Sequence, residues 1–165
     1  MKYLTNLFLL FFFSINAIAQ KESFDITEFT APKAWTKQAS ESTMQFAKED
    51  TSTGAFCMIT LLKPMPGTAS AKENFDLSWT SVVKEMVTVS TAPEMQPPAT
   101  EDGWEALSGY APFEKDGIKG VAILVTSSGF QKMVNIIILT NTDVYEKEIT
   151  TFLESVNLKK PVAEK

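Results

Sequence analysis

Met133-Val134-Asn135-Ile136-Ile137-Ile138-Leu139 is apolar at both odd and even positions, and only Asn135 interrupts the run. Successive side chains of a strand point to opposite faces of a sheet, so a strand of this composition needs cover on both sides. Residues 55–62 and 118–126 have the same two-sided apolar character. A sheet that contains all three strands has no face for water, and the sequence therefore predicts further layers on both sides of it.

Alternating runs and turn signals supply the rest of the sheet. Three further strands are predicted at residues 23–29, 43–47 and 104–110. The turns between strands are predicted from Pro32 within residues 31–35, from Asp116-Gly117 and from Ser127-Ser128-Gly129. Short connections of this kind make neighbouring strands antiparallel.

Two amphipathic helices are predicted, at residues 71–87 and 142–156. Ser70 with Glu73, and Asp143 with Glu146, have the spacing of a capping box at the two helix starts. The apolar stripes at helical spacing are Phe75, Trp79, Val82, Val83 and Met86 in the first helix, and Tyr145, Ile149, Phe152 and Val156 in the second. We therefore expect an α+β fold in a single domain: a central, mainly antiparallel sheet of six or seven strands between helices, in three layers.

The first nineteen residues have the three parts of a secretory signal peptide. Lys2 provides the positive charge, residues 7–13 form the apolar segment, and Ala17-Ile18-Ala19 gives the small residues that signal peptidase needs. The alternatives are a retained anchor, which requires about 20 apolar residues, and a buried N-terminal helix. We expect cleavage between Ala19 and Gln20, which releases a soluble protein into the periplasm or the medium. A lipid anchor would require a cysteine in place of Gln20.

Cleavage leaves residues 20–160 as one domain and residues 161–165 as a disordered C-terminal tail. The chain has 20 acidic and 15 basic side chains, a formal net charge of −5, and every basic residue is lysine. Without arginine or histidine, Ser-His-Asp and Cys-His catalysis, histidine-ligated zinc and arginine clamps are excluded. An acidic protein also does not attract nucleic acid. The single cysteine, Cys57, lies in an apolar run and is expected to be buried and unreactive.

Candidate binding residues come from aromatic side chains and from the longest predicted loop, residues 91–103. The loop carries three prolines and several carboxylates. Long ordered loops are often functional, although a solvated connector has the same composition. The candidate ligand- or partner-binding residues are Trp35, Glu101, Asp102, Trp104 and Tyr110. No catalytic residue, metal ligand or cofactor is predicted.

Phe29-Thr30-Ala31-Pro32-Lys33-Ala34-Trp35 resembles the opening of PsbP-like domains, in which a strand is followed by proline, a short spacer and tryptophan. Phe152-Leu153-Glu154-Ser155-Val156-Asn157-Leu158 is similar to the way such domains end. This fold is shared by the extrinsic photosystem II protein PsbP and a Ran-binding nuclear import factor. The resemblance implies binding, because the better-known members are accessory proteins that dock onto larger assemblies. It also implies that Trp35 is a structural anchor, with its indole N–H near solvent or a carbonyl group.

We therefore expect an exported, non-enzymatic binding or accessory domain, monomeric, with an unknown protein or ligand partner. Two alternatives remain open. A carrier of a small apolar ligand would have a pocket lined by Trp35, Trp79, Trp104, Tyr110 and Phe130, unless these rings are simply core. A carboxylate-dependent hydrolase would use Glu101, Asp102 and Glu105.

Overall fold

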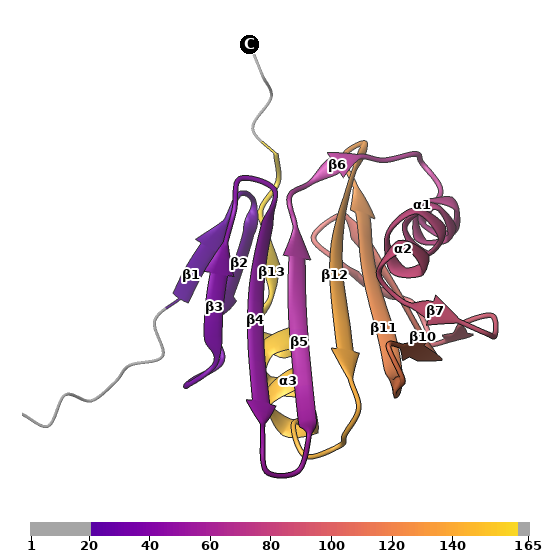
Figure 1. The fold of residues 1–165 in the computed structure, drawn as a ribbon. Coiled ribbons are helices and arrows are strands. Elements are labelled where there is room, and N and C mark those ends of the chain that lie inside the picture. The colour runs from indigo at the N-terminus through magenta and orange to yellow at the C-terminus, as the bar shows by residue number, and fades with distance from the viewer. Residues whose placement is uncertain (1–20, 162–165) are drawn as a thin grey trace, which may run out of the picture.

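The computed structural model describes residues 21–161 (Figure 1). The predicted signal peptide and nearly all of the predicted tail lie outside the described residues. The strands are β1 Lys21–Phe24, β2 Thr27–Thr30, β3 Thr36–Ala39, β4 Thr43–Asp50, β5 Ala55–Leu62, β6 Met65–Pro66, β7 Thr88–Val89, β8 Glu94–Met95, β9 Ala99–Glu101, β10 Trp104–Lys115, β11 Ile118–Gly129, β12 Lys132–Thr140 and β13 Asn157–Leu158. The helical segments are α1 Ala71–Ser78, η1 Trp79–Val83, α2 Lys84–Met86 and α3 Glu146–Ser155.

One antiparallel sheet forms the middle of the molecule, with strand order β3-β4-β5-β12-β11-β10-β7. The short strand β6 pairs with β12, and β8 and β9 pair with β10. The run that begins at Met133 forms most of the central strand β12, which is buried on both faces and lies between β5 and β11. The predicted α+β fold with a large antiparallel sheet is confirmed.

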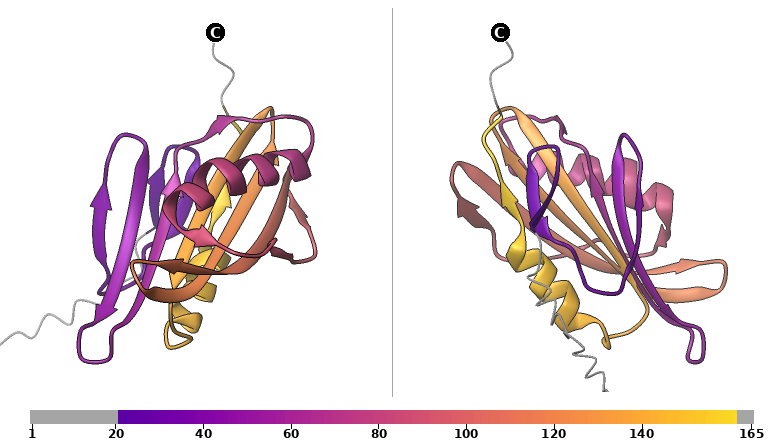
Figure 2. Two further views of the ribbon diagram at one scale, coloured as in Figure 1. Left: turned by 45° about the vertical axis from the view of Figure 1, so that its right-hand side comes forward. Right: turned by 90° about the vertical axis from the view of Figure 1, so that its left-hand side faces the viewer.

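The two faces of this sheet are covered differently (Figure 2). The segments α1, η1 and α2 form one continuous helical stretch over the first face, which we call the α1 face. The other face, the α3 face, is covered by α3 together with a small sheet of order β1-β2-β13. Helices alone were expected in both outer layers. The small sheet forms because residues 23–29 are not one strand: the chain turns at Asp25, whose φ is 54°, and returns as β2.

Aromatic side chains fill the core under α3. Phe29 from β2, Phe46 from β4 and Phe152 from α3 meet with ring centroids 5.7 to 6.0 Å apart. The three rings come from the small sheet, the main sheet and the helix. They therefore join the main sheet to the layer formed by α3 and the small sheet. On the α1 face, Phe75 and Trp79 stack with centroids 5.9 Å apart, as their shared stripe predicts.

Helix α1 begins as predicted, but its cap differs from a capping box. The hydroxyl of Ser70 accepts the N–H of Glu73 at 3.2 Å. The carboxylate of Glu73 accepts the hydroxyl of Thr68 instead of the Ser70 N–H, which donates to Thr68 Oγ1. The capping box predicted for the second helix is wrong. Helix α3 starts at Glu146 after Tyr145, without a side-chain cap.

The turn predicted at residues 127–129 and the loop predicted at residues 91–103 are also wrong. Ser127, Ser128 and Gly129 belong to β11, and the turn after them falls at Phe130 and Gln131, both with positive φ. The predicted loop at residues 91–103 contains β8 and β9, which pair with the outer edge of β10. Breaking an edge into short pieces between prolines is a common protection against unwanted strand pairing.

The strand β11 is not covered on both faces as predicted. On the α1 face, Ala122 and Leu124 are buried under α1, whereas Ile123 and Val125 on the α3 face are only partly buried and Val121 is exposed. Helix α3 packs over the half of the sheet that contains β4, β5 and β12. The α3 face of β10 and β11 is therefore left partly open.

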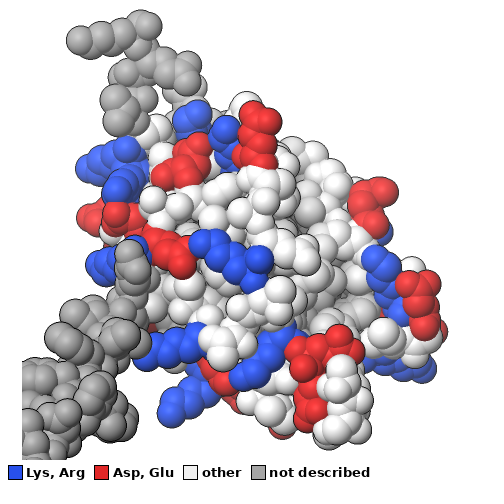
Figure 3. Space-filling view, turned by 60° about the vertical axis from the view of Figure 1, so that its left-hand side comes forward, with Lys and Arg blue, Asp and Glu red and all other residues white. Residues whose placement is uncertain are grey.

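Between Lys21 and Pro161, no helix is long and apolar enough to cross a membrane. The charged side chains of both signs are interspersed on the face shown in Figure 3, so that face carries no extended patch of one sign.

Candidate functional site

A groove of about 330 Å³ occupies the part of the α3 face that α3 does not reach. We call it the Trp104 groove. Its floor is formed by strands β10, β11 and β12, one wall by the end of α3 with β13, and the other wall by β9 and the segment before it. The lining residues, in this order, are Ala106, Ser108, Val125, Ser127 and Ile136 on the floor, Leu153, Val156, Asn157 and Leu158 on the first wall, and Pro97, Ala99, Glu101, Asp102 and Trp104 on the second.

Small side chains on the floor create the hollow. Ala106 lies opposite Ser127 in the β10–β11 register, and Ser108 lies opposite Val125. A large side chain at these positions would fill the space that Leu153 and Val156 leave at the end of α3. The hydroxyls of Ser108 and Ser127 have no hydrogen-bond partner among the described residues, so they remain available in a mainly apolar lining.

Trp104 closes one end of the groove and is 5% exposed. Its ring contacts Phe130 edge to face, with centroids 5.4 Å apart, and lies against Gly129, where a Cβ would come within 3.0 Å of Cε3. Cε3 and Cδ2 are the indole atoms nearest to a Cβ at Gly129, and Nε1 is on the opposite long edge of the ring. This N–H is buried and has no hydrogen-bond partner among the described residues. A buried donor without an acceptor costs about 1 to 3 kcal/mol.

Glu101 and Asp102 lie on the rim, at the tip of the hairpin that joins β9 to β10. Asp102 and Gly103 form the turn with φ values of 50° and 87°, which asparagine, aspartate and glycine adopt most readily. Both carboxylate side chains are exposed, and neither takes part in an ion pair with another described residue. Glu105 and Phe130 line a second hollow, which shares Glu101, Asp102 and Trp104 with the Trp104 groove.

The structure thus brings Glu101, Asp102 and Trp104 together and separates them from the other two candidates. Tyr110 lies farther along β10, where the side chain of Glu94 accepts its phenol hydrogen bond and raises the pKa of Tyr110. Trp35 packs in the core under α3, edge to face with Tyr145 at 5.8 Å. The expectation for the Trp35 indole is wrong, because its N–H is buried without a partner in the described structure.

The five rings considered for a carrier do not share a cavity. Trp35 lies in the core under α3, Trp79 in the core under α1, and Trp104 with Phe130 at the end of β10. Of these rings, Trp104 is the one that lines the groove. In residues 21–161, no three His, Cys, Asp or Glu side chains gather as a metal site would require. The groove is suited to non-covalent binding through apolar contact and two hydroxyls.

Sequence reasoning missed the residues that make the groove hollow. Ala106, Ser108 and Ser127 are small and polar or weakly apolar, and nothing in their spacing distinguishes them from ordinary strand positions. One signal was present: Asp102-Gly103 is a hairpin pair of the same kind as Asp116-Gly117. A hairpin predicted at Asp102-Gly103 would have placed Glu101 and Asp102 at a turn tip beside Trp104.

No protein-family model matches this chain, and no curated protein matches it. Solved structures do match. A Bacteroides thetaiotaomicron protein of known crystal structure is 14% identical with a TM-score of 0.54; the match covers 86% of this chain and 49% of that protein, so this chain spans about half its length. The solution structure of cyanobacterial PsbP (CyanoP) from Synechocystis is 15% identical with a TM-score of 0.56, covering 87% of this chain and 95% of CyanoP. The chain therefore has a PsbP-like fold, as its opening and closing segments predicted.

Proposed function

We propose that this chain is an exported, non-enzymatic binding domain that holds a partner in the Trp104 groove. The observation that carries the proposal is the buried, unpartnered N–H of Trp104 beside a mainly apolar hollow. Ligand sites are usually concave and mainly apolar, with a few polar groups that fix orientation. The export part rests on the composition of residues 1–19.

The arrangement of the carboxylates supports binding over hydrolysis. Glu101, Asp102 and Glu105 all line the second hollow, and all three side chains are exposed to solvent there. A general acid needs surroundings that keep its proton near neutral pH, which are usually apolar and shielded from water. The separation of the aromatic rings likewise gives the small-ligand carrier less support than a partner that occupies an open groove.

The test is recovery of the mature domain from the envelope fraction of its own cells, followed by native mass spectrometry. We expect wild-type protein to carry a partner, and Ser127→Phe, which places a ring on the groove floor, to lose it. Ser23→Phe is the matched control, because Ser23 is exposed on β1 and lines none of the hollows described above. The control should keep the partner.

Two results would contradict the proposal. One is a partner retained by Ser127→Phe as well as by wild type, which would place binding elsewhere. The other is a protein that is always ligand-free and monomeric, yet turns over a substrate in a broad hydrolase screen. Loss of that turnover in a Glu101→Gln, Asp102→Asn variant would then identify the carboxylates as the reacting groups.

A further inference from the structure

The rim of the Trp104 groove carries uncompensated negative charge. Glu101 and Asp102 have no ion pair in the described part of the chain, and no lysine lines the groove. Of the two lysines that follow β13, Lys159 pairs with Glu28 at 2.7 Å, and Lys160 lies 5.9 Å from the centroid of the Phe130 ring beside Gly103, without an ion pair to Glu101 or Asp102. A cationic group on the partner would therefore complement this rim.

The residues on the floor and at the end of the groove favour an occupant that has an apolar group and a hydrogen-bond acceptor. Ala106, Val125 and Ile136 present apolar surface, and burying it favours an apolar group in the partner. Trp104 Nε1–H needs an acceptor, and the hydroxyls of Ser108 and Ser127 accept or donate. A peptide backbone supplies carbonyl and N–H groups of both kinds, whereas a simple organic cation supplies no acceptor.

We infer that the occupant of the Trp104 groove is an extended segment of a partner protein in which an apolar residue stands beside a lysine or arginine. This inference rests on the proposed function and specifies the chemistry of its partner. The apolar side chain lies on the floor, the cation faces Glu101 and Asp102, and a backbone carbonyl accepts the Trp104 N–H. Because this N–H is buried, binding of the segment requires that the side chains that cover it move aside.

The experiment follows the indole N–H resonances of the ¹⁵N-labelled mature domain while blocked peptides are added. Trp104 is identified by the resonance that disappears in Trp104→Phe. The probes are acetyl-Leu-Lys-Leu-amide, the matched acetyl-Leu-Glu-Leu-amide, and hexylamine as a small apolar cation. We expect the lysine peptide to shift the Trp104 resonance saturably. The glutamate peptide and hexylamine should shift it weakly or not at all.

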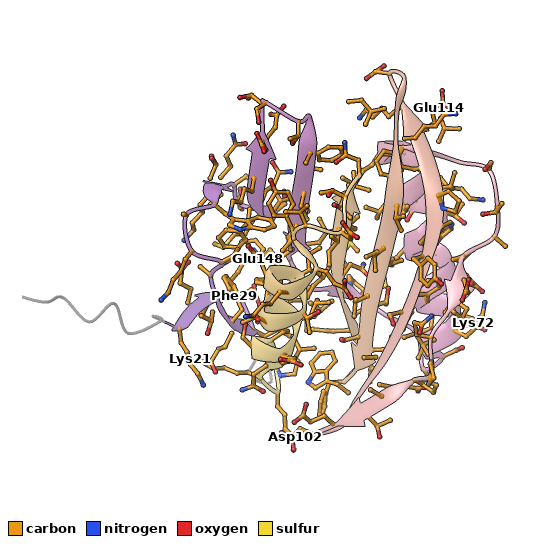
Figure 4. All side chains as sticks on the ribbon, turned by 90° about the horizontal axis from the view of Figure 1, so that it is seen from below. Lys21, Phe29, Lys72, Asp102, Glu114 and Glu148 are labelled. Atoms are coloured by element: carbon orange, nitrogen blue, oxygen red, sulfur yellow. The ribbon has the colours of Figure 1, made fainter. Side chains whose placement is uncertain are left out.

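Charge variants test the rim directly. Glu101→Gln with Asp102→Asn should weaken binding of the lysine peptide about two- to tenfold, as expected for two exposed charges. Glu114→Gln with Asp116→Asn is the control, because it removes two charges at the other hairpin tip of β10, also an Asp-Gly turn, on the opposite side of the molecule (Figure 4). It should leave binding unchanged.

The outcomes separate this inference from the proposed function. Equal binding of the two peptides, equal binding of hexylamine, or an unchanged affinity in the Glu101, Asp102 variant overturns the basic peptide as the occupant. The proposed function survives any of these results if the native partner is still lost in Ser127→Phe. If the native partner is retained there, the proposed function fails whatever the peptides do.

Discussion

At the scale of single residues, burial determines how Cys57 behaves. It lies in β5 facing α3 and is 1% exposed. Burial raises the pKa of its thiol from 9.0 to about 12, and a hydrogen bond with Thr140 opposes this only in part. The thiolate is the reactive form of cysteine, so the folded protein presents almost none of it at neutral pH. The sequence interpretation of a buried cysteine is confirmed.

Cys57 should therefore resist alkylation in the folded protein. With iodoacetamide at pH 8, we expect intact mass to show almost no adduct over a time in which the same protein in guanidinium chloride is fully modified. The unfolded sample is the control for reagent and pH. Rapid single modification of the folded protein would show that β5 opens easily or that the thiol is accessible.

The same shift predicts a loss of stability at high pH. The pKa of Cys57 is higher in the folded state than in the unfolded state, so its contribution is fully present below pH 9 and is lost as the pH rises from 9 towards 12. Above pH 9, the free energy of unfolding of wild type should fall relative to Cys57→Ala by about 1.4 kcal/mol per pH unit. Urea unfolding at pH 7, 9 and 10.5 measures the difference, in which the contributions of lysines and tyrosines cancel. A difference that does not change with pH would contradict it.

At the scale of elements, a sequence signal predicts the structure correctly where it depends only on residues near it in the chain. The apolar stripe and Ser70 predict the helical stretch that begins at Ala71, because both act within one or two turns of helix. The π-helical segment Trp79–Val83 has no such signal. Asp143 fails as a cap, since the chain after β12 needs an additional turn before Tyr145 can enter the core. Pairing of β9 with β10 has a local signal in Asp102-Gly103, whereas pairing of β8 with Gly109 and Tyr110 has none.

Removing the cap of α1 should destabilise the protein measurably. Ser70→Ala leaves the N–H of Glu73 without its acceptor, and we expect a loss of about 1 kcal/mol in the free energy of unfolding, measured with urea. Ser81→Ala is the matched control, since the hydroxyl of Ser81 bonds back to the carbonyl oxygen of Leu77 within the helix. Such a bond adds little, so this variant should be neutral or slightly more stable. Equal losses in both variants would mean that Ser70 does not act as a cap.

At the scale of the whole molecule, two-sided apolar strands determine the number of layers but not what covers them. The pattern of β12 and β5 required cover on both faces; the structure supplies it for β12, whereas Phe56, Met58 and Leu62 of β5 are only partly buried on the α1 face. Half of the α3 layer is a small sheet. This sheet forms because the chain makes a hairpin at Asp25 and because β13 pairs with β2, which brings the two ends of the domain together. The groove exists because α3 ends before it covers β10 and β11, which the sequence does not indicate. The residue types of Glu101, Asp102 and Trp104 made them candidate binding residues. The floor residues Ala106, Ser108 and Ser127 have no such distinguishing property.

The meeting point of Phe29, Phe46 and Phe152 should be where the layers depend most on one another. Phe152 is fully buried and contacts rings from both sheets, so Phe152→Ala removes packing within the α3 layer and between it and the main sheet. We expect a loss of about 3 to 5 kcal/mol in the free energy of unfolding, a large part of the 5 to 15 kcal/mol typical of a domain. Phe130→Ala is the control, because Phe130 is 45% exposed at a hairpin tip and should cost far less.

Because Phe152→Ala alone could fail to fold, Phe152→Leu provides a measurable intermediate. Leucine keeps most of the apolar volume, and its loss should fall between those of Phe130→Ala and Phe152→Ala. Guanidinium unfolding followed by both far-ultraviolet circular dichroism and tryptophan fluorescence should give one coincident transition for each variant, since the two cores share the central sheet. Two separate transitions in Phe152→Leu would show that α3 and the small sheet unfold independently of the main sheet. A loss no greater than that of Phe130→Ala would contradict the packing of α3 against both sheets.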